Sequence, residues 1–337
     1  VYMTGILPIK KYGTHSALNM FYEYSMTAPG EFAPYFGFTE KEVRMLCEEY
    51  HMNFEEAHDW YDGYGLTAHT LTGIQKYSMY SPKSVVEAML RHKFGTYWNQ
   101  TETYEALKLY IQMNIDGLKD SVIEMIAGAK IPVQTGTFSN DMTTFHSEDD
   151  VLTLLIHLGY LGYDFSHKSV FIPNNEIRGE FVNAVSVSQW GEVSKALKNS
   201  ADLLNAIWRK DEEKVAVYME QAHFETSHLQ YNNENALSYT VSLALYAARN
   251  FYQVYREFPS GSGFADIVYL PRKEFPDKPA LIVELKWNKS AEGAIHQILK
   301  KQYFQNLEDY SGNMLLVGIN YDLKTRKHEC KILEFKK

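Results

Sequence analysis

The sequence has little cysteine and no long apolar run. Its 337 residues include only two cysteines, Cys47 and Cys330. They are too few for a disulfide framework, and neither has a spacing typical of zinc ligands. We therefore expect a reducing, cytoplasmic setting. No apolar stretch approaches the roughly 18 residues of a membrane span, which predicts a soluble protein without a membrane partner.

A phosphate loop and a secretion signal are also missing. No G-x-x-x-x-G-K-[ST] motif occurs in the chain, so these residues alone are not expected to hydrolyse ATP. The first residues, "VYMTGILPI", are typical of a buried strand rather than of a signal peptide. Because this strand comes without an initiator Met, we expect the chain to be a piece of a longer protein.

Charge of the two signs is divided unevenly. The net charge is −9, yet the residues from Glu234 onward hold 15 Lys and Arg against 12 Asp and Glu, a balance of +3. The rest of the chain holds 18 against 30, a balance of −12. The asymmetry is compatible with a C-terminal part that meets phosphate groups and an N-terminal part that does not.

The residues before 229 are mainly helical in pattern. Apolar residues recur at helical spacing in "GFTEKEVRMLCEEY", "SPKSVVEAMLRHK", "TYEALKLYIQMNIDGLKDSVIEMIAG" and "DDVLTLLIHLGYLG". Thr39, followed three residues later by Glu42, predicts a helix start. We expect one domain at residues 1–149 and a helical, winged-helix-like connector at residues 150–228.

The residues from 229 onward change to a pattern with strands. A helix that begins near Asn232 or Asn233 is followed by strands at "YQVYREF", "FADIVYL" and "ALIVELKW". A helix from about Ala291 to Asn306 and the strands "NMLLVGINY" and "HECKILEF" complete the order. The sequence therefore predicts a domain with the order α-β-β-β-α-β and a further strand at its end.

Two neighbouring strands of this domain carry charged residues within apolar runs. In "FADIVYL", Asp266 alternates with Phe264 and Val268, and in "ALIVELKW", Glu284 and Lys286 point to one side of the sheet. Carboxylates at such positions can hold a divalent ion, and an adjacent lysine can orient a water or offset charge on a phosphate. The other interpretation is a surface ion pair on a one-sided sheet, and the pattern alone leaves both open.

The residues from about Asn233 to the end resemble the PD-(D/E)XK nuclease superfamily. The resemblance rests on "GSGFADIVYLP", "KPALIVELKW", "AEGAIHQILKKQY" and "LLVGINYDLKTRKHECKI". It is similar to the nuclease-like domain that follows an AAA-ATPase-like domain in many bacterial proteins. "TGILPIKKYGTHSALNMF", "YFGFTEKEV", "WYDGY" and "YSPKSVVEAML" resemble the end of that ATPase core and its helical lid.

The resemblance implies a fold class and a set of site residues. The fold is α/β, α+β overall: a mainly helical lid and connector, then a restriction-endonuclease-like domain at residues 229–337. Lys286 is implied as the catalytic lysine and Gln297 as the helix glutamine that accompanies it. The implied ligands of Mg²⁺ or Mn²⁺ are Glu234, Asp266, Glu284 and the Leu285 carbonyl, with Glu257 as a weaker candidate than Glu234.

Helical spacing adds a prediction about the nucleic acid. Gln297, Lys300, Lys301 and Phe304 share one face of their helix, which favours contact of Lys300 and Lys301 with a phosphate backbone. A plain solvated face is the other interpretation. Tyr303 lies off this face, and its spacing favours a packing aromatic.

The function implied is a metal-dependent DNA nuclease regulated by an ATPase domain that is mostly absent from these residues. ATP is then bound only by the longer protein. The alternative is a nuclease-like fold without catalysis that serves as an interaction module for nucleic acid or protein. The sequence leaves the choice of DNA or RNA and the oligomeric state open.

Overall fold

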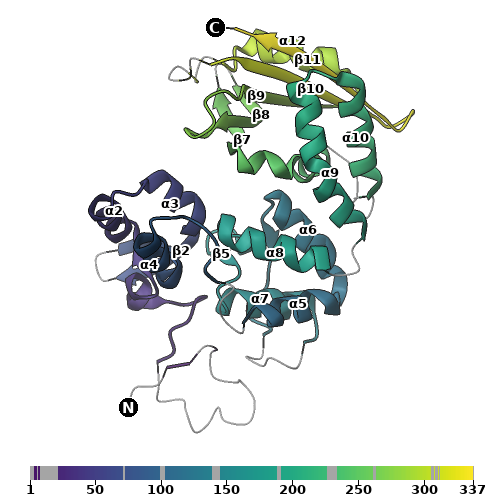
Figure 1. Ribbon diagram of the computed structural model, residues 1–337. Coiled ribbons are helices and arrows are strands. Elements are labelled where there is room, and N and C mark those ends of the chain that lie inside the picture. The colour runs from purple at the N-terminus through teal and green to yellow at the C-terminus, as the bar shows by residue number, and fades with distance from the viewer. Residues whose placement is uncertain are drawn as a thin grey trace. The chain divides into compact units, whose positions relative to one another are not determined.

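The structure, a computed structural model, describes residues 4–5, 7, 22–70, 73–98, 103–138, 145–187, 191–225, 234–260, 263–304, 307, 310 and 312–336. Contacts group the chain into two compact units, Val1–Gln189 and Trp190–Lys337. Figure 1 labels many of the elements of both. The strand expected at residues 1–9 falls almost entirely outside the described residues. The expected domain boundaries after residues 149 and 228 remain predictions.

The N-terminal unit combines helices with two small sheets. The strand orders of these sheets are β1-β3-β2 and β4-β6-β5. Its elements are η1 (Gly30–Tyr35), β1 (Phe38–Thr39), α2 (Glu40–Glu49), α3 (Phe54–Tyr61), β2 (Tyr64–Thr70), β3 (Gly73–Tyr80), α4 (Pro82–Arg91), α5 (Thr103–Met113), η3 (Ile115–Gly117), α6 (Leu118–Ala127), β4 (Ile131–Pro132), α7 (Glu148–His157), β5 (Gly162–Asp164), β6 (Ser169–Phe171) and α8 (Asn175–Val187).

Local signals explain where α2 begins and why α5 and α6 are separate helices. At α2, the Thr39 side chain accepts a hydrogen bond from the Glu42 backbone and the Glu42 carboxylate accepts one from the Thr39 backbone, as the sequence predicted. The single helix expected over residues 103–128 is wrong. Asn114 and Asp116 have φ of 44° and 47°, in the left-handed region, so the helical ladder breaks between α5 and α6.

The β2–β3 hairpin was missed by the helical interpretation of this region. Tyr64, Leu66 and Ala68 alternate along β2 and are buried, while Gly65 between them is exposed. This period of two is the ordinary sign of a strand with one buried face. The prediction of a mainly helical region passed over this alternation.

The C-terminal unit is built on one five-stranded sheet with the order β11-β10-β9-β8-β7. β9 and β10 are parallel and the other neighbours are antiparallel. Its elements are α9 (Gly191–Trp208), α10 (Glu212–Glu225), α11 (Glu234–Ala244), η4 (Tyr246–Asn250), β7 (Tyr252–Ser260), β8 (Gly263–Pro271), β9 (Ala280–Trp287), α12 (Ala291–Lys301), β10 (Met314–Asp322) and β11 (Lys327–Phe335). The predicted mixed α/β class and the order of elements after α11 are confirmed.

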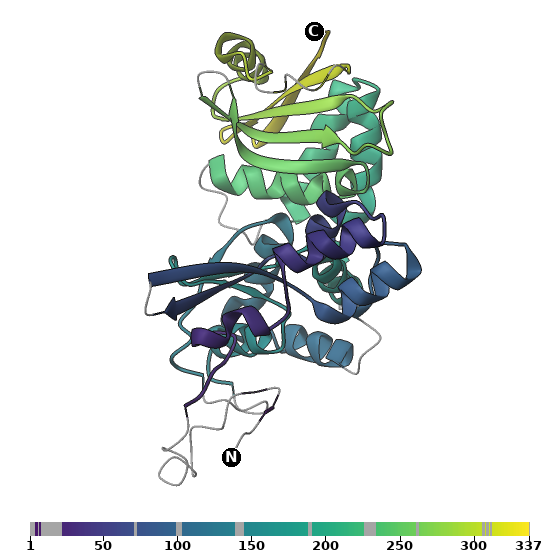
Figure 2. The ribbon, with the colours of Figure 1, turned by 90° about the vertical axis from the view of Figure 1, so that its left-hand side faces the viewer.

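Helices cover both faces of this sheet (Figure 2). On one face, residues of α9, α10 and α11 pack against Val283 and Leu285 of β9. On the other, α12 packs against Ile282 of the same strand. Both faces of β9 are therefore buried, and each large aliphatic side chain there stabilises the fold by about 1.5–3 kcal/mol. A charged group on this strand has to find its partners inside the protein.

Gly318 sets the distance between α12 and the sheet. It is paired in register with Glu284, and a Cβ atom at this position would lie 2.3 Å from the Ala291 carbonyl oxygen and 2.9 Å from the Ala294 Cβ. Only glycine permits so close an approach. The start of α12 therefore lies directly over the middle of β9 and β10.

Asn320 holds the connection between β9 and α12. It is buried, its Oδ1 accepts a hydrogen bond from the Lys289 backbone at 3.0 Å, and its Nδ2 donates to the Lys289 carbonyl at 3.2 Å. Ser290 then caps α12 by accepting a bond from the Gly293 backbone. The path from the end of β9 into α12 is thus fixed on both sides.

Across the part of the chain that the structure describes, no helix is long and apolar enough to cross a membrane.

We expect Gly318→Ala to destabilise the C-terminal unit by about 1–3 kcal/mol, because the added methyl group forces α12 away from the sheet. Calorimetric unfolding of the whole chain measures the effect. Gly65→Ala is the control, since a Cβ there meets nothing within 4 Å. An unfolding transition of the C-terminal unit that is unchanged in Gly318→Ala would show that the close approach is not needed.

Candidate active site

Glu284 and Lys286 lie on the face of β9 that α12 covers. Ile282, two residues earlier on the same face, packs in the cluster beneath α12, whereas Val283 and Leu285 pack on the opposite face. The exposed fraction is 1% for Glu284 and 7% for Lys286. The expectation that the two share a face is confirmed, and the interpretation as a surface ion pair is wrong because both groups are buried.

Asp266 lies where β8 and β9 separate. The two strands pair from Tyr269 with Leu281 to Ile267 with Val283, and the next pair in register, Asp266 with Glu284, is not formed. Instead, the Asp266 Oδ2 accepts a hydrogen bond from the Leu285 backbone nitrogen at 2.7 Å. A side-chain carboxylate thus takes the place of the next strand's carbonyl. Because β8 separates from β9 here, the Asp266 carboxylate contacts the backbone of Leu285, the residue between Glu284 and Lys286.

The alternation of β8 slips at this residue. Ala265 and Val268 pack beneath α12, whereas Ile267 and Tyr269 pack on the other face. Two residues three apart on one face cannot belong to a regular strand. The expected regular alternation of Asp266 with its neighbours is therefore wrong, and the irregularity turns its carboxylate toward β9.

The partner strand β7 is irregular at the same level. Arg256 pairs with Ile267 and Phe258 with Ala265, so Glu257 stands opposite Asp266. Glu257 has a φ of 48°, a left-handed backbone in the middle of a strand. Its side chain is exposed. The two irregular positions lie side by side, and they make room at the point where β8 leaves β9.

The Glu284 carboxylate is held through one of its two oxygens. The Lys286 Nζ lies 2.7 Å from the Glu284 Oε1 and 3.0 Å from the Leu285 carbonyl oxygen. The Gln297 Nε2, from α12, also donates to the Glu284 Oε1. The other oxygen, Oε2, is buried and has no hydrogen-bond partner. An unpartnered buried carboxylate oxygen is costly unless something else binds it.

Burial and a neighbouring charge change the protonation of Glu284. Burial, as the largest cause, and the Asp266 carboxylate together raise its pKa from the ordinary 4.5 to about 7, although Lys286 and Lys301 act in the opposite direction. The unfolded chain loses this proton near pH 4.5 and the folded one only near pH 7. The contribution to stability is therefore present at low pH and is lost as the pH rises from about 4.5 to 7.

The donor set fits a hard divalent cation. Asp266, Glu284 and the Leu285 carbonyl offer oxygen atoms, which Mg²⁺ and Mn²⁺ prefer, and the buried Glu284 Oε2 has no other partner. A cation also relieves the repulsion between the two carboxylates that raises the Glu284 pKa. Within the described residues no group of three or more His, Cys, Asp or Glu side chains gathers at one point. The fit therefore depends on two carboxylates and one backbone oxygen.

The other predicted site residues take different positions. Glu234 is the first residue of α11, and its side chain lies outside the described residues. Lys300 is exposed. Lys301 lies against the start of β8, where a Cβ at Gly263 would be 3.0 Å from its Cδ and 3.1 Å from its Nζ. Gln297 and Lys301 thus lie at the candidate site, and Lys300 points to solvent.

Tyr303 packs in the core beneath α12, which confirms the prediction of a packing aromatic, and it also contacts the candidate site. It is fully buried, and its hydroxyl accepts a hydrogen bond from the Gln297 Nε2 at 3.0 Å. α12 ends at Gln302, whose φ is 53°, so Tyr303 no longer follows the helical wheel. The sequence signal for this contact was a tyrosine that comes directly after the helix that carries Gln297. Tyr303 positions Gln297, which in turn holds Glu284.

Comparison with known proteins agrees with the domain that this geometry defines. Residues 233–331 match the family model of the PD-(D/E)XK nuclease superfamily, so the C-terminal unit contains a domain of this superfamily. Neither the curated proteins nor the solved structures gave a match to the chain. The family suggests hydrolysis of phosphodiester bonds.

The raised pKa of Glu284 predicts a pH-dependent response to Mn²⁺. Binding requires the carboxylate form, so the apparent affinity should fall about tenfold per pH unit below pH 7 and level off above it. The measurement is the shift in unfolding temperature with Mn²⁺ at pH 6, 7 and 8. Glu284→Gln should abolish the shift, and Glu329→Gln, an exposed carboxylate on β11, should not. Equal shifts at pH 6 and 8 would contradict this role of Glu284.

Proposed function

We propose that the C-terminal unit is a metal-dependent nuclease that hydrolyses phosphodiester bonds in DNA. The observation that carries the proposal is the buried Glu284–Lys286 pair beside Asp266, just beyond the point where the pairing of β8 with β9 ends at Ile267 and Val283. Neither charged group is needed for packing on a strand that is otherwise apolar. A superfamily domain over the same residues supports the same reaction.

Each residue has a chemical role in this proposal. Asp266, Glu284 and the Leu285 carbonyl would hold Mg²⁺ or Mn²⁺, and Glu234 at the start of α11 remains a proposed fourth donor. The ion, when bound, lowers the pKa of a water and offsets charge on the phosphate. Gln297 keeps the Glu284 carboxylate in place through its bond to Oε1.

The lysines act on the phosphate and the water. The Lys286 ammonium, held at the two oxygens of Glu284 and Leu285, can orient the attacking water or stabilise negative charge on the phosphate. Lys301, beside Gly263, supplies a second positive charge at the mouth of the strand opening. Lys300, on the exposed side of α12, would contact the DNA backbone further away.

A second candidate function is a nuclease-like domain that binds without cleaving. The observation that favours it is that the Glu284 Oε1, the Leu285 carbonyl and the Asp266 Oδ2 already accept hydrogen bonds within the protein. A domain that never holds a cation would be stable in this form. The resemblance of residues 1–149 to an ATPase core and lid supports the further proposal that ATP binding in a longer protein regulates either function.

Asp266→Asn should lower DNA cleavage by on the order of 10³-fold, because it removes a metal-binding charge. The change should leave the fold intact, since the asparagine oxygen still accepts the bond from the Leu285 backbone. Lys286→Met should have a comparable effect. The measurement is the rate of cleavage of single- and double-stranded DNA with Mg²⁺ and Mn²⁺.

The control for these variants is Glu329→Gln, which removes an exposed carboxylate from β11 and should cleave at the parent rate. Full activity of either Asp266→Asn or Lys286→Met would refute the proposed mechanism. A parent chain that binds DNA and Mn²⁺ but does not cleave would favour the binding module.

A further inference from the structure

A basic surface lies at the end of β9, beyond the candidate active site. β9 and β10 are parallel, so both strands end at the same edge of the sheet. The loop from β9 to α12 therefore lies beside the turn from β10 to β11, which forms the tip of a hairpin (Figure 1). We call Lys289 of the loop, with Leu323, Lys324 and Arg326 of the turn, the hairpin surface.

Hydrogen bonds fix the loop against the turn. The Asn288 backbone nitrogen donates to the Tyr321 carbonyl at 2.8 Å, and the Asn288 Oδ1 accepts a bond from the Leu323 backbone nitrogen at 2.8 Å. Asn288 has a φ of 53°, a left-handed backbone at which the chain changes direction. Asn320 holds the Lys289 backbone by two further bonds. The place of Lys289 beside the turn is therefore set by contacts from β10.

The turn is also supported from within. The Asp322 Oδ1 accepts hydrogen bonds from the Thr325 backbone nitrogen at 2.7 Å and from the Thr325 Oγ1 at 3.0 Å. Asp322 is the one acidic residue of the turn sequence "DLKTRK", and this bonding is the usual work of an aspartate in a turn. The three basic residues of the same six are exposed. The turn therefore presents positive charge on a fixed backbone.

The cations of the hairpin surface are not used in ion pairs. Lys289, Lys324 and Arg326 are exposed, and in the part of the chain that the structure describes none of them pairs with a carboxylate. Further along β11, by contrast, the Lys331 Nζ lies 3.3 Å from a carboxylate oxygen of α10. Leu323, between the loop and the two cations of the turn, is 53% exposed. Unpaired cations around an apolar side chain suit a nucleic-acid backbone, which offers phosphates and apolar sugar or base surface.

The hairpin surface is continuous with the candidate active site. β8 pairs with β9 only as far as Val283, so in the described sheet the stretch from Glu284 to Trp287 pairs with β10 alone. The sheet is thus open on the β8 side toward the end of β9. Lys289 follows Lys286 by three residues, at most about 10 Å of chain at ~3.3 Å per residue. This length corresponds to about three base pairs at ~3.4 Å each.

We propose that the hairpin surface binds the nucleic-acid backbone beside the scissile bond. This inference rests on the proposed function, and it names the side of the active site on which the substrate continues. The three cations contact phosphates, and Leu323 packs on a sugar or base between them. Because the asparagine bonds already fix the loop and the turn, little conformational freedom is lost on binding.

The test is DNA binding by the full chain in EDTA, so that no cleavage occurs. Fluorescence anisotropy of a labelled duplex of about 20 base pairs gives the Kd over a range of salt concentrations. Lys289→Gln, Lys324→Gln and Arg326→Gln should each raise the Kd about fivefold at ~0.15 M salt. Each should also reduce the slope of log Kd against log salt by about one unit. Leu323→Ser should raise the Kd with an unchanged slope, because it removes no charge.

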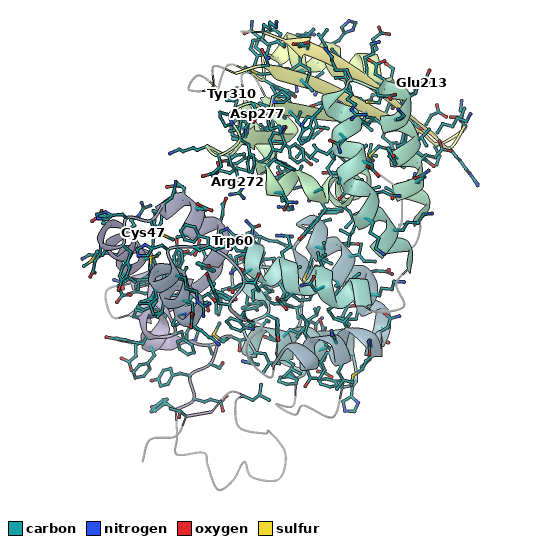
Figure 3. The ribbon with its side chains drawn as sticks, in the orientation of Figure 1. Cys47, Trp60, Glu213, Arg272, Asp277 and Tyr310 are labelled. Atoms are coloured by element: carbon teal, nitrogen blue, oxygen red, sulfur yellow. The ribbon has the colours of Figure 1, made fainter. Side chains whose placement is uncertain are left out.

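Lys273→Gln is the matched control. Lys273 is an exposed lysine at the opposite end of β9, in the connection from β8, and it directly follows Arg272, which Figure 3 labels. Its loss removes the same charge and should leave the Kd and the slope unchanged. An equal effect of Lys273→Gln would show that only net charge matters and would overturn the hairpin surface. All these side chains are exposed, so the variants should unfold at the parent temperature.

The outcomes distinguish this inference from the proposed function. Parent protein that cleaves DNA, with an unchanged Kd and slope in the lysine and arginine variants, would overturn the hairpin surface and leave the nuclease intact. Parent protein that binds with the expected slopes but never cleaves with Mg²⁺ would overturn the nuclease and leave the surface. A Kd that rises in Leu323→Ser alone would indicate an apolar contact without phosphates and overturn the proposal.

Discussion

The site depends on the ion pair between Glu284 and Lys286. This pair is buried on one face of β9, a strand that is covered on both faces. Moving two charges out of water costs several kcal/mol for each, and their attraction at 2.7 Å offsets this cost only in part. Apolar residues of similar size would serve packing at least as well. The pair also leaves one Glu284 oxygen without a partner, so stability does not explain it. The catalytic role proposed above accounts for the pair, and Asp266, Gln297 and Lys301 lie around it.

Backbone irregularities, rather than regular sheet geometry, put these groups within reach of one another. β8 and β9 separate after Ile267, and the left-handed Glu257 in β7 stands level with the same opening. On the other side, Gly318 lets α12 approach the sheet beside Glu284. Because α12 ends just before Tyr303, the Tyr303 hydroxyl lies within hydrogen-bond distance of Gln297. Each of these features is unfavourable or unusual alone. Together they open the sheet on one side of Glu284 and close it on the other.

The sequence was sufficient for the parts that follow periodicity. It predicted the order of strands and helices after α11, the shared face of Glu284 and Lys286, and the start of α2, because each depends on local spacing or on one capping pair. It did not predict the slip at Asp266, the break between α5 and α6, or the contact of Tyr303 with Gln297. These depend on single residues with left-handed backbone or on contacts between distant strands, which leave no periodic signal. The β2–β3 hairpin was visible as alternation and was missed only because its neighbourhood looked helical.

Isothermal titration of Mn²⁺ at pH 8 into the whole chain and into Asp266→Asn tests the central claim most directly. The account predicts binding by the parent and its loss in the variant, with the same unfolding temperature for both in the absence of metal. Binding that persists unchanged in Asp266→Asn, or no binding by the parent at all, would contradict a cation site between Asp266 and Glu284.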